Sequence, residues 1–217
     1  MPLYKTITLS QRTTMYLWKV EESLEKLSEN ILLTPHCQDR LASMKSELHQ
    51  RGFMSIRHLL AAAGYVDHDL YYDDFGKPHL TDNNFISITH SYHFTGIIVS
   101  DQDVGIDIEM QRDKILRIAN KFTNLESYYT LANTEAIVRK LTIVWGAKES
   151  IYKLYGQKGL SFLQHIDVKE FNFEDAETTA DVFYEGAESS YDIGFLEFEG
   201  FTCVYALPIA KNGINEH

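Results

Sequence analysis

Two acidic side chains in a short and otherwise apolar segment are the clearest candidates for chemistry. They are Asp107 and Glu109, within the run Val104–Glu109 (Val-Gly-Ile-Asp-Ile-Glu). If this run is a β-strand, its three branched apolar residues point to one face and the two carboxylates point to the other. Paired oxygen ligands on a rigid strand suit Mg²⁺ or Mn²⁺. The alternative is a half-exposed strand whose polar face is solvated.

A third acidic residue lies in a long stretch with helical periodicity, from about Thr134 to Tyr155. Trp145, Glu149 and Lys153 are four residues apart, which places them on one side of the helix. Glutamate followed by lysine at this spacing is ordinarily a surface ion pair. Tryptophan, however, is too large and apolar to face water at low cost. We therefore expect this side of the helix to be covered by protein or by a ligand.

Two cationic groups stand where strands are expected to turn or end. Lys77 lies between Gly76 and Pro78 in a tight turn, and His90 follows Thr89 in a β-rich run. Taken alone, each is ordinarily a solvated lysine or a structural histidine.

A larger set of basic residues lies in the first half of the chain. The set comprises Arg40, Lys45, Arg51 and Arg57, with His36, His49 and His58 nearby. If this set faces a cleft, it could hold an anion such as a phosphate. The alternative is the solvated face of an amphipathic helix.

Composition and missing motifs exclude several classes of function. The 217-residue chain has a formal net charge of −11, whereas general nucleic-acid binders have basic surfaces. No apolar run reaches the roughly 18 residues of a membrane span, and no signal-peptide pattern begins the sequence. Cys37 and Cys203 lie far apart, so neither a disulfide framework nor a zinc site is predicted. Phosphate loops, dinucleotide-binding glycines, nucleophile elbows and H-E-x-x-H motifs are absent. We expect a cytoplasmic protein.

Local patterns predict the elements that must hold these side chains. Strands are expected near residues 3–9, 15–20, 70–74, 85–91 and 94–100. A helix is expected over residues 21–30, and another begins at Thr34-Pro35 and continues to Ala63, where Gly64 ends it. Four further strands, near residues 165–171, 181–184, 191–198 and 201–207, predict an antiparallel sheet. The fold class is therefore α+β.

The domain organisation follows from the absence of a low-complexity linker. We expect an N-terminal half, residues 1–103, and a C-terminal half, residues 104–217, packed against each other.

Four blocks of sequence, taken together, resemble the 4′-phosphopantetheinyl transferase superfamily. They are Gly76-Lys77-Pro78, Ile86–Ser91 (Ile-Ser-Ile-Thr-His-Ser), Gly105–Glu109 (Gly-Ile-Asp-Ile-Glu) and Trp145–Lys153 (Trp-Gly-Ala-Lys-Glu-Ser-Ile-Tyr-Lys). Phe122–Glu126 is similar to the short connecting motif of the family. The likeness is to the longer branch, of the type that primes carrier domains in surfactin or enterobactin synthesis. Residues 1–70 resemble that branch more loosely.

The resemblance implies a pseudo-two-fold pair of similar α/β halves, with the active site in the cleft between them. It implies transfer of the 4′-phosphopantetheine arm of coenzyme A to a serine of an acyl or peptidyl carrier protein, with release of adenosine 3′,5′-bisphosphate. Mg²⁺ or Mn²⁺ would be the metal. A single chain would build the whole cleft, so we expect a monomer, with neither nucleic acid nor membrane as a partner.

The resemblance also assigns roles to residues. It implies that Asp107, Glu109 and Glu149 gather the metal ion, and that Lys77 and His90 contact the phosphates of coenzyme A. Further candidate contacts are Thr89, Ser91, Lys148, Lys153, Arg40, Lys45, Arg51 and Arg57. As catalytic residues we expect Asp107, with Glu149 to accept the proton of the serine and Lys153 to stabilise the leaving phosphate.

Two positions depart from the family pattern. Threonine stands at position 89, where the family usually has serine, and Cys37 stands where a lysine is expected. Two other functions remain open: a module that binds coenzyme A without catalysis, and a metal-dependent phosphohydrolase that uses the same carboxylates.

Overall fold

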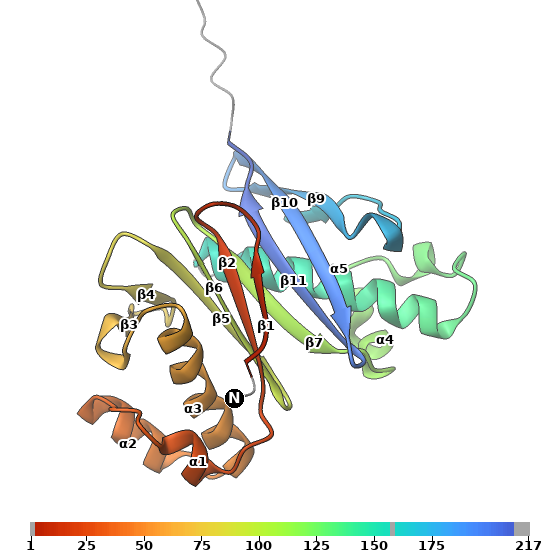
Figure 1. Cartoon of the computed structure of the whole chain (residues 1–217). Coiled ribbons are helices and arrows are strands. Elements are labelled where there is room, and N and C mark those ends of the chain that lie inside the picture. Colours follow the sequence, from red (N-terminus) through yellow and green to blue (C-terminus); the bar gives the residue numbers. More distant parts are fainter. Residues whose placement is uncertain (1–2, 157–158, 211–217) are drawn as a thin grey trace, which may run out of the picture.

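Two antiparallel β-sheets lie side by side in the computed structural model, which describes residues 3–156 and 159–210 (Figure 1). The first sheet has the strand order β1-β2-β6-β5. Its strands are β1 (Leu3–Thr8), β2 (Thr14–Lys19), β5 (Phe85–Ser91) and β6 (Phe94–Ser100). The second sheet has the order β7-β11-β10-β9-β8. Its strands are β7 (Gly105–Met110), β8 (Ile166–Val168), β9 (Glu177–Tyr184), β10 (Ala187–Phe198) and β11 (Phe201–Pro208).

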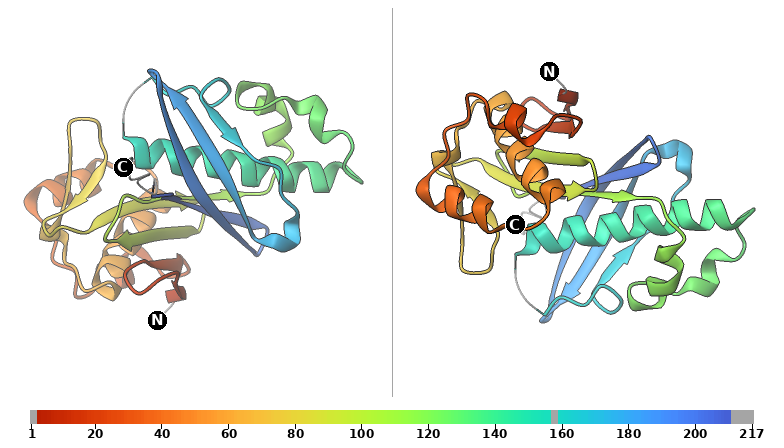
Figure 2. Two further views of the ribbon diagram at one scale, coloured as in Figure 1. Left: turned by 90° about the horizontal axis from the view of Figure 1, so that it is seen from above. Right: turned by 90° about the horizontal axis from the view of Figure 1, so that it is seen from below.

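Each sheet is covered by a helix that packs against its strands. On the first sheet α3 (Glu47–Ala62) contacts β2 and β6, and α1 (Leu24–Ser28) and α2 (Pro35–Ser43) lie on the same side of the molecule (Figure 2). On the second sheet α5 (Thr134–Tyr155) runs across β7 and β11, with the short α4 (Lys114–Ile118) near its N-terminal end. A small hairpin of β3 (Leu70–Tyr72) and β4 (Pro78–Leu80) connects α3 to β5.

The two sheets meet where β5 and β7, each the outer strand of its sheet, run next to each other. Side-chain hydroxyls connect the two strands. Ser87 Oγ accepts a hydrogen bond from the Ile106 N–H at 3.1 Å, and Thr89 Oγ1 accepts one from the Ile108 N–H at 2.9 Å. Because two otherwise exposed strand edges are paired in this way, the two halves form one continuous body.

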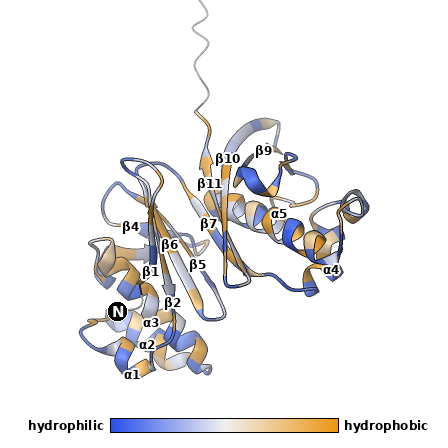
Figure 3. Cartoon of the chain, turned by 45° about the vertical axis from the view of Figure 1, so that its right-hand side comes forward, coloured by the Kyte–Doolittle hydropathy of each residue, from blue (hydrophilic) through white to orange (hydrophobic). Residues whose placement is uncertain are grey.

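Three apolar clusters stabilise this arrangement. One lies under α5, one under α3, and the third joins the sheets through Met15, Leu17, Phe94, Ile106 and Phe201, all fully buried. Figure 3 shows hydrophobic and hydrophilic residues together along α5, as expected for a helix with one face on a sheet. None of the helices within residues 3–156 and 159–210 is long and apolar enough to cross a membrane.

Most predicted elements are confirmed, and the long helix has the predicted bounds, Thr134–Tyr155. It ends because Gly156 adopts φ 66°, a left-handed conformation that favours glycine. Thr34 caps α2 as predicted, with its hydroxyl accepting a hydrogen bond from the Cys37 N–H.

The prediction of one continuous helix over residues 34–63 is wrong. The α2 helix ends at Ser43 and α3 begins at Glu47, because Met44 and Ser46 have extended backbone angles. The Ser43 hydroxyl donates to the Arg40 carbonyl at 2.7 Å. Serine side chains that bond to nearby backbone in this way weaken helix continuation.

The predicted boundary between the halves falls between the two sheets. The last strand of the first sheet ends at Ser100, and the first strand of the second sheet begins at Gly105. The outermost residues of both predicted halves, 1–2 and 211–217, lie outside the described residues. Pseudo-two-fold symmetry between the halves stays a prediction.

Candidate active site between the two sheets

Asp107 and Glu109 point away from the core, as the alternation predicts. Ile106 and Ile108, on the other face of β7, are fully buried in the cluster that joins the two sheets. Asp107 itself is only 6 % exposed, and Glu109 is half-buried. Both carboxylates are therefore held beside protein rather than in open solvent, which argues against a merely solvated strand face.

Two glycines allow α5 to approach β7 and β11 closely. A Cβ at Gly105 would lie 1.8 Å from the Ser150 carbonyl oxygen, and a Cβ at Gly146 would lie 2.6 Å from the Val204 side chain. The Ser150 hydroxyl donates to the Val204 carbonyl at 3.0 Å, which fixes the helix on the sheet. This short distance between backbones brings the next residues of α5 to the carboxylates of β7.

Lys153 of α5 is bonded directly to Asp107. Its ammonium lies 2.7 Å from Asp107 Oδ1 and 2.9 Å from the Ile106 carbonyl oxygen. An ammonium has three N–H donors, so one remains for another acceptor. Lys153 also lines a cavity, and that donor is available to a ligand there.

The three predicted carboxylates influence one another electrostatically. Burial, and then the charge of Asp107, raise the pKa of Glu149 to about 7, while Lys153 opposes the shift. Burial and the charge of Asp107 also raise the pKa of Glu109. Burial raises the pKa of Asp107, although Lys153 again acts in the opposite direction. Each shift indicates carboxylates that need a further positive charge to ionise easily.

Part of this arrangement fits a divalent cation. Asp107 Oδ2 is buried and has no hydrogen-bond partner, and oxygen ligands are what Mg²⁺ and Mn²⁺ prefer. Over residues 3–156 and 159–210, however, no three or more His, Cys, Asp or Glu side chains are grouped to hold a metal ion. The metal role of Asp107, Glu109 and Glu149 therefore stays a prediction.

A cavity of about 330 Å³ lies beside Lys153, between the two halves. The β3–β4 hairpin contributes Tyr72, Phe75 and Lys77 to its lining. The Lys77 ammonium lies 2.7 Å from the Leu154 carbonyl at the end of α5 and 3.0 Å from Asp103 Oδ1. The predicted Gly-Lys-Pro turn is thus placed at the cavity.

A second cavity, of about 290 Å³, shares Tyr72 and Ile88 with the first. Arg40, His49 and His90 line it, and the Arg40 guanidinium lies 5.2 Å from the centre of the Tyr72 ring. Desolvation by the surrounding protein, followed by Lys153 and His49, lowers the pKa of His90. The lowered pKa favours neutral His90, so Arg40 is the side chain that offers a positive charge to an anionic ligand in this cavity.

Thr89 and Ser91, two members of the predicted set, are buried in β5, and Thr89 joins it to β7. Thr89 is buried, accepts from the Ile108 N–H and donates to Asp107 Oδ1 at 3.4 Å. Ser91 is buried at the end of β5. Thr89 thus touches the site through Asp107.

Lys148 is not brought to the cavities, which corrects its assignment as a coenzyme A contact. It is 4 % exposed, and its ammonium donates to the carbonyls of Phe122, Phe162 and Ile166 at 2.6 to 2.7 Å. All three of its N–H donors are therefore used by backbone.

Arg57 lines the second cavity but is bonded to protein groups. Its side chain is 2 % exposed, with Nε 2.9 Å from Asp67 Oδ1 and the guanidinium 3.5 Å from the centre of the Phe53 ring. Its Nη2 donates to Cys37 Sγ, so the residue at the departing position 37 belongs to this buried network. Arg57 is an internal ion-pair partner even though it lines the second cavity.

The remaining two basic candidates are also placed elsewhere. Arg51 donates to the Val20 carbonyl at 3.1 Å and lines neither of the two cavities described above. Lys45 is exposed between α2 and α3, likewise outside both cavities. Of the four arginine and lysine candidates before residue 60, Arg40 alone is an accessible member of the cavity lining.

The side of α5 that carries Trp145 is covered by protein. The Trp145 ring centre lies 5.1 Å from that of Phe122 and 5.3 Å from that of Phe162. A hydrogen bond from Trp145 also opposes the rise in the pKa of Glu109. The interpretation of Glu149 and Lys153 as a simple surface pair is therefore wrong.

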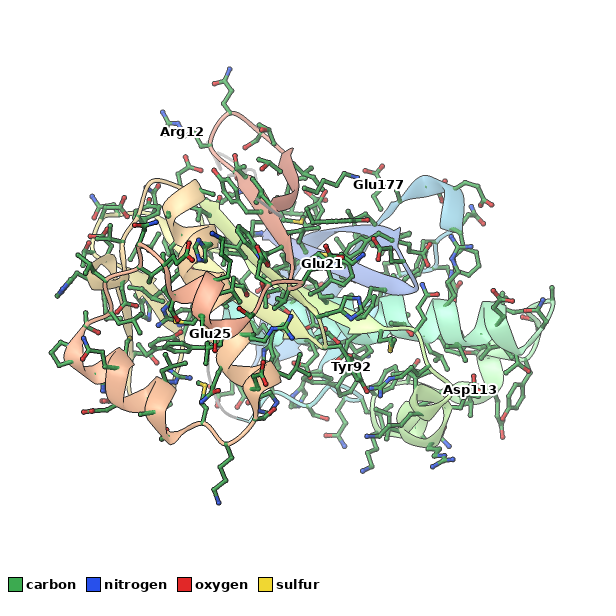
Figure 4. All side chains as sticks on the ribbon, turned by 60° about the horizontal axis from the view of Figure 1, so that its bottom comes forward. Arg12, Glu21, Glu25, Tyr92, Asp113 and Glu177 are labelled. Atoms are coloured by element: carbon green, nitrogen blue, oxygen red, sulfur yellow. The ribbon has the colours of Figure 1, made fainter. Side chains whose placement is uncertain are left out.

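A contact between the halves lies on one side of this site. Arg112, which follows β7, stacks 4.8 Å over the ring of Tyr92 and donates to its hydroxyl. Tyr92 is in the β5–β6 turn, and Figure 4 shows it on the same side of the molecule as Asp113, just before α4.

Comparison with known proteins finds a matching family model for the second half of the chain. Residues 103–206 match the family model of the 4′-phosphopantetheinyl transferase superfamily. This matched part, a little under half of the chain, resembles that superfamily. Among curated relatives, the 4′-phosphopantetheinyl transferase gsp of Aneurinibacillus migulanus is 27 % identical over 134 residues, which cover 60 % of this chain and 54 % of that protein. The aligned stretch therefore spans about half the length of that transferase.

The superfamily match covers the carboxylates and Lys153, whereas Lys77, His90 and Arg40 lie before it. The sequence reasoning missed Tyr72, Phe75 and Tyr152 as lining residues of the first cavity. Tyr72 and Phe75 lie just before the Gly-Lys-Pro turn, and these two aromatic residues were the sequence signal that could have indicated a role of the hairpin in the cavity. His49 was noticed only as part of the basic set, and its place near His90, with ring centres 6.4 Å apart, depends on the tertiary fold.

Removing the hydroxyl that joins Thr89 to β7 should destabilise the junction of the sheets. We expect Thr89→Val to lower the free energy of unfolding by about 1 to 3 kcal/mol, because the Ile108 N–H would be buried without an acceptor. Thr89→Ser retains the hydroxyl and should remain close to the original stability. Urea unfolding of the three proteins measures this, and equal midpoints for the valine and serine variants would contradict the assignment.

Proposed function

We propose that this protein transfers the 4′-phosphopantetheine arm of coenzyme A to a serine hydroxyl of an acyl or peptidyl carrier protein. The observation that carries the proposal is the bond of Lys153 to Asp107 beside a cavity, within the part of the chain that matches the superfamily. The charge of Asp107 also raises the pKa of Glu149. The relative from Aneurinibacillus migulanus is itself named as a 4′-phosphopantetheinyl transferase.

The donor would occupy the two neighbouring cavities, which share Tyr72 and Ile88 in their linings. Arg40, His49 and His90 offer positive or protonatable groups to the nucleotide phosphates, and Lys77 lies at the other cavity beside Phe75. Cationic donors form their strongest hydrogen bonds with phosphate oxygens. The pyrophosphate would then lie near Lys153, which lines the first cavity.

The reaction forms one P–O bond and breaks another. The serine oxygen attacks the phosphorus that carries pantetheine, and the bond to the phosphate of adenosine 3′,5′-bisphosphate breaks. Glu149, with its pKa raised to about 7, is suited to accept the serine proton directly or through water. Lys153 can donate its remaining N–H to the leaving phosphate.

Mg²⁺ or Mn²⁺, held by Asp107, Glu109 and Glu149, would neutralise the developing charge and polarise the phosphoryl oxygen. The buried and unpartnered Asp107 Oδ2 supports this assignment. We propose a monomer that acts in the cytoplasm, where the two buried and free cysteines would stay reduced.

The carrier protein would approach the rim of the cleft. The segment Glu170–Ala210 contains ten acidic residues and neither lysine nor arginine, so it would repel an acidic carrier. Arg112 and Lys114, by contrast, line a small cavity together with Glu109.

The proposed nucleotide contact of Arg40 can be separated from the structural role of Arg57. We expect Arg40→Ala to weaken coenzyme A binding by about 10- to 100-fold with little change in stability, because it removes a charge-assisted hydrogen bond. Arg57→Met should instead lower the unfolding free energy by about 3 to 5 kcal/mol, since Asp67 would be left buried and unpaired. Calorimetric titration with coenzyme A and urea unfolding measure the two effects, and unchanged affinity in Arg40→Ala would contradict the placement of the donor.

Chromatography of the nucleotide products tests the proposed reaction. With coenzyme A, Mg²⁺ and an apo carrier protein, we expect adenosine 3′,5′-bisphosphate to accumulate in proportion to the carrier. A carrier in which alanine replaces the acceptor serine should give none. Product without any carrier would favour a phosphohydrolase, and binding of coenzyme A without product would favour an inactive binding module.

A further inference from the structure

Lys148 has an unusual position for a lysine in the middle of a helix. It is 4 % exposed, and its ammonium is bonded to three carbonyls from separate segments. Phe122 follows α4, Phe162 lies in the connection after α5, and Ile166 begins β8. The acceptors are neutral, and none is part of a cavity described above.

The same two phenylalanines surround Trp145, one turn earlier on α5. Lys148 binds their backbones through hydrogen bonds, and Trp145 contacts their rings at 5.1 and 5.3 Å between centres. Tyr152 packs on the Phe162 ring as well, at 5.6 Å. The backbone bonds of Lys148 therefore fix the walls between which the Trp145 ring lies.

Trp145 in turn reaches a carboxylate of the proposed active site. Trp145 and Glu109 both line a cavity of about 150 Å³ between β7 and α5, so the indole forms part of the surroundings of this carboxylate. A displaced indole would change this cavity and with it the packing around the Glu109 side chain.

We propose that Lys148 is a positioning residue that holds Phe122 and Phe162 around Trp145 and thereby fixes Glu109. The catalytic consequence rests on the proposed transferase function, whereas the structural consequence does not. Loss of a residue that orients a ligand group ordinarily costs about 10- to 100-fold in activity. We expect Lys148→Met to lower kcat by this factor and to leave the KM for coenzyme A nearly unchanged, because Arg40, Lys77 and His90 lie on other elements.

Lys140 provides a matched control on the same helix. It is 7 % exposed, its ammonium donates to the Phe171 carbonyl, and it lies 3.4 Å from the centre of the Phe171 ring. Lys140→Met therefore also removes a buried ammonium bonded to backbone, but it leaves the surroundings of Trp145 intact. An effect common to both variants would be general destabilisation of α5.

Tryptophan fluorescence tests the positioning role without any assay of transfer. The chain has two tryptophans, so Trp18→Phe leaves Trp145 as the sole reporter. In this background we expect Lys148→Met to shift the emission to longer wavelength and to increase quenching by acrylamide, and Lys140→Met to do neither. Transfer kinetics of the same variants with an apo carrier protein then show whether the substitution changes kcat, the KM for coenzyme A, or both.

An unchanged Trp145 emission in Lys148→Met would overturn the proposal, as would an equal shift in Lys140→Met. If Lys148→Met does not fold, Lys148→Arg takes its place, since a planar guanidinium cannot keep all three carbonyl bonds. The same shift is then expected, and its absence overturns the proposal. A shift in emission accompanied by no transfer even in the parent protein would confirm the positioning role and reject the transferase function.

Discussion

Asp107→Asn is expected to lower the transfer rate by at least about 10³-fold while the protein stays folded. The substitution keeps the shape of the side chain but removes the charge that pairs with Lys153 and that would hold a metal ion. Removal of a single preorganised electrostatic group at a reacting centre costs about 10² to 10³, and this residue serves two such interactions. Because Asp107 raises the pKa of both Glu109 and Glu149, its neutralisation also relieves repulsion between buried carboxylates. We therefore expect little loss of stability.

The measurement for Asp107→Asn is the initial rate of carrier modification, together with a thermal unfolding curve. Asp192→Asn, in an exposed position of β10, is the matched control and should retain full activity. A variant at position 107 that keeps more than about one tenth of the rate would remove Asp107 from the catalytic residues.

Glu149→Gln is expected to lower kcat by about 10² to 10⁴, the contribution of a positioned general base. It should also change how stability depends on pH in metal-free protein. The ordinary glutamate pKa is 4.5, and burial with the Asp107 charge raises it to about 7 in the folded state. The folded protein therefore binds more protons between these values than the unfolded chain, so the free energy of unfolding falls as the pH rises from 4.5 to 7. Asp107 and Glu109 act in the same direction.

Urea unfolding at several pH values, with EDTA present, measures this dependence. Glu149→Gln should have a smaller decrease between pH 4.5 and 7, whereas Glu135→Gln, in the exposed first turn of α5, should match the parent protein. Equal slopes for all three proteins would show that Glu149 does not carry the raised pKa.

Much of the fold could be predicted from local patterns. The alternation in β7 placed Asp107 opposite Ile106 and Ile108, and the periodicity of α5 gave the bounds of the helix. Both succeed because one face of each element is buried, so the apolar residues repeat with the period of the structure. The three-residue strand β4 was missed, since it begins with proline and is too short for a pattern.

The burial and the bonding partners of the cationic residues could not be predicted from local sequence. Lys148 and Lys153 stand five positions apart on α5, yet one bonds three carbonyls and the other bonds Asp107. Arg57 is buried because Asp67 lies in a neighbouring turn. Whether a charged side chain can be buried depends on an ion-pair or hydrogen-bond partner, and only the tertiary fold brings that partner near.

The resemblance implied that Lys148 contacts coenzyme A, but the structure does not bring this residue to either cavity. The residue lies within the Trp-Gly-Ala-Lys-Glu block, one of the four on which the resemblance rests. Helical residues five positions apart point about 140° apart, and this rotation separates buried Lys148 from Lys153, which lines the first cavity.

Intact-mass spectrometry of an apo acyl carrier protein tests the central claim most directly. The carrier is incubated with this protein, coenzyme A and Mg²⁺, and a parallel sample contains EDTA. We predict that the carrier mass increases by one phosphopantetheine arm, that the increase is absent with EDTA, and that Asp107→Asn gives none. An unmodified mass across acyl and peptidyl carriers, with coenzyme A still bound to the protein, would contradict the transferase function.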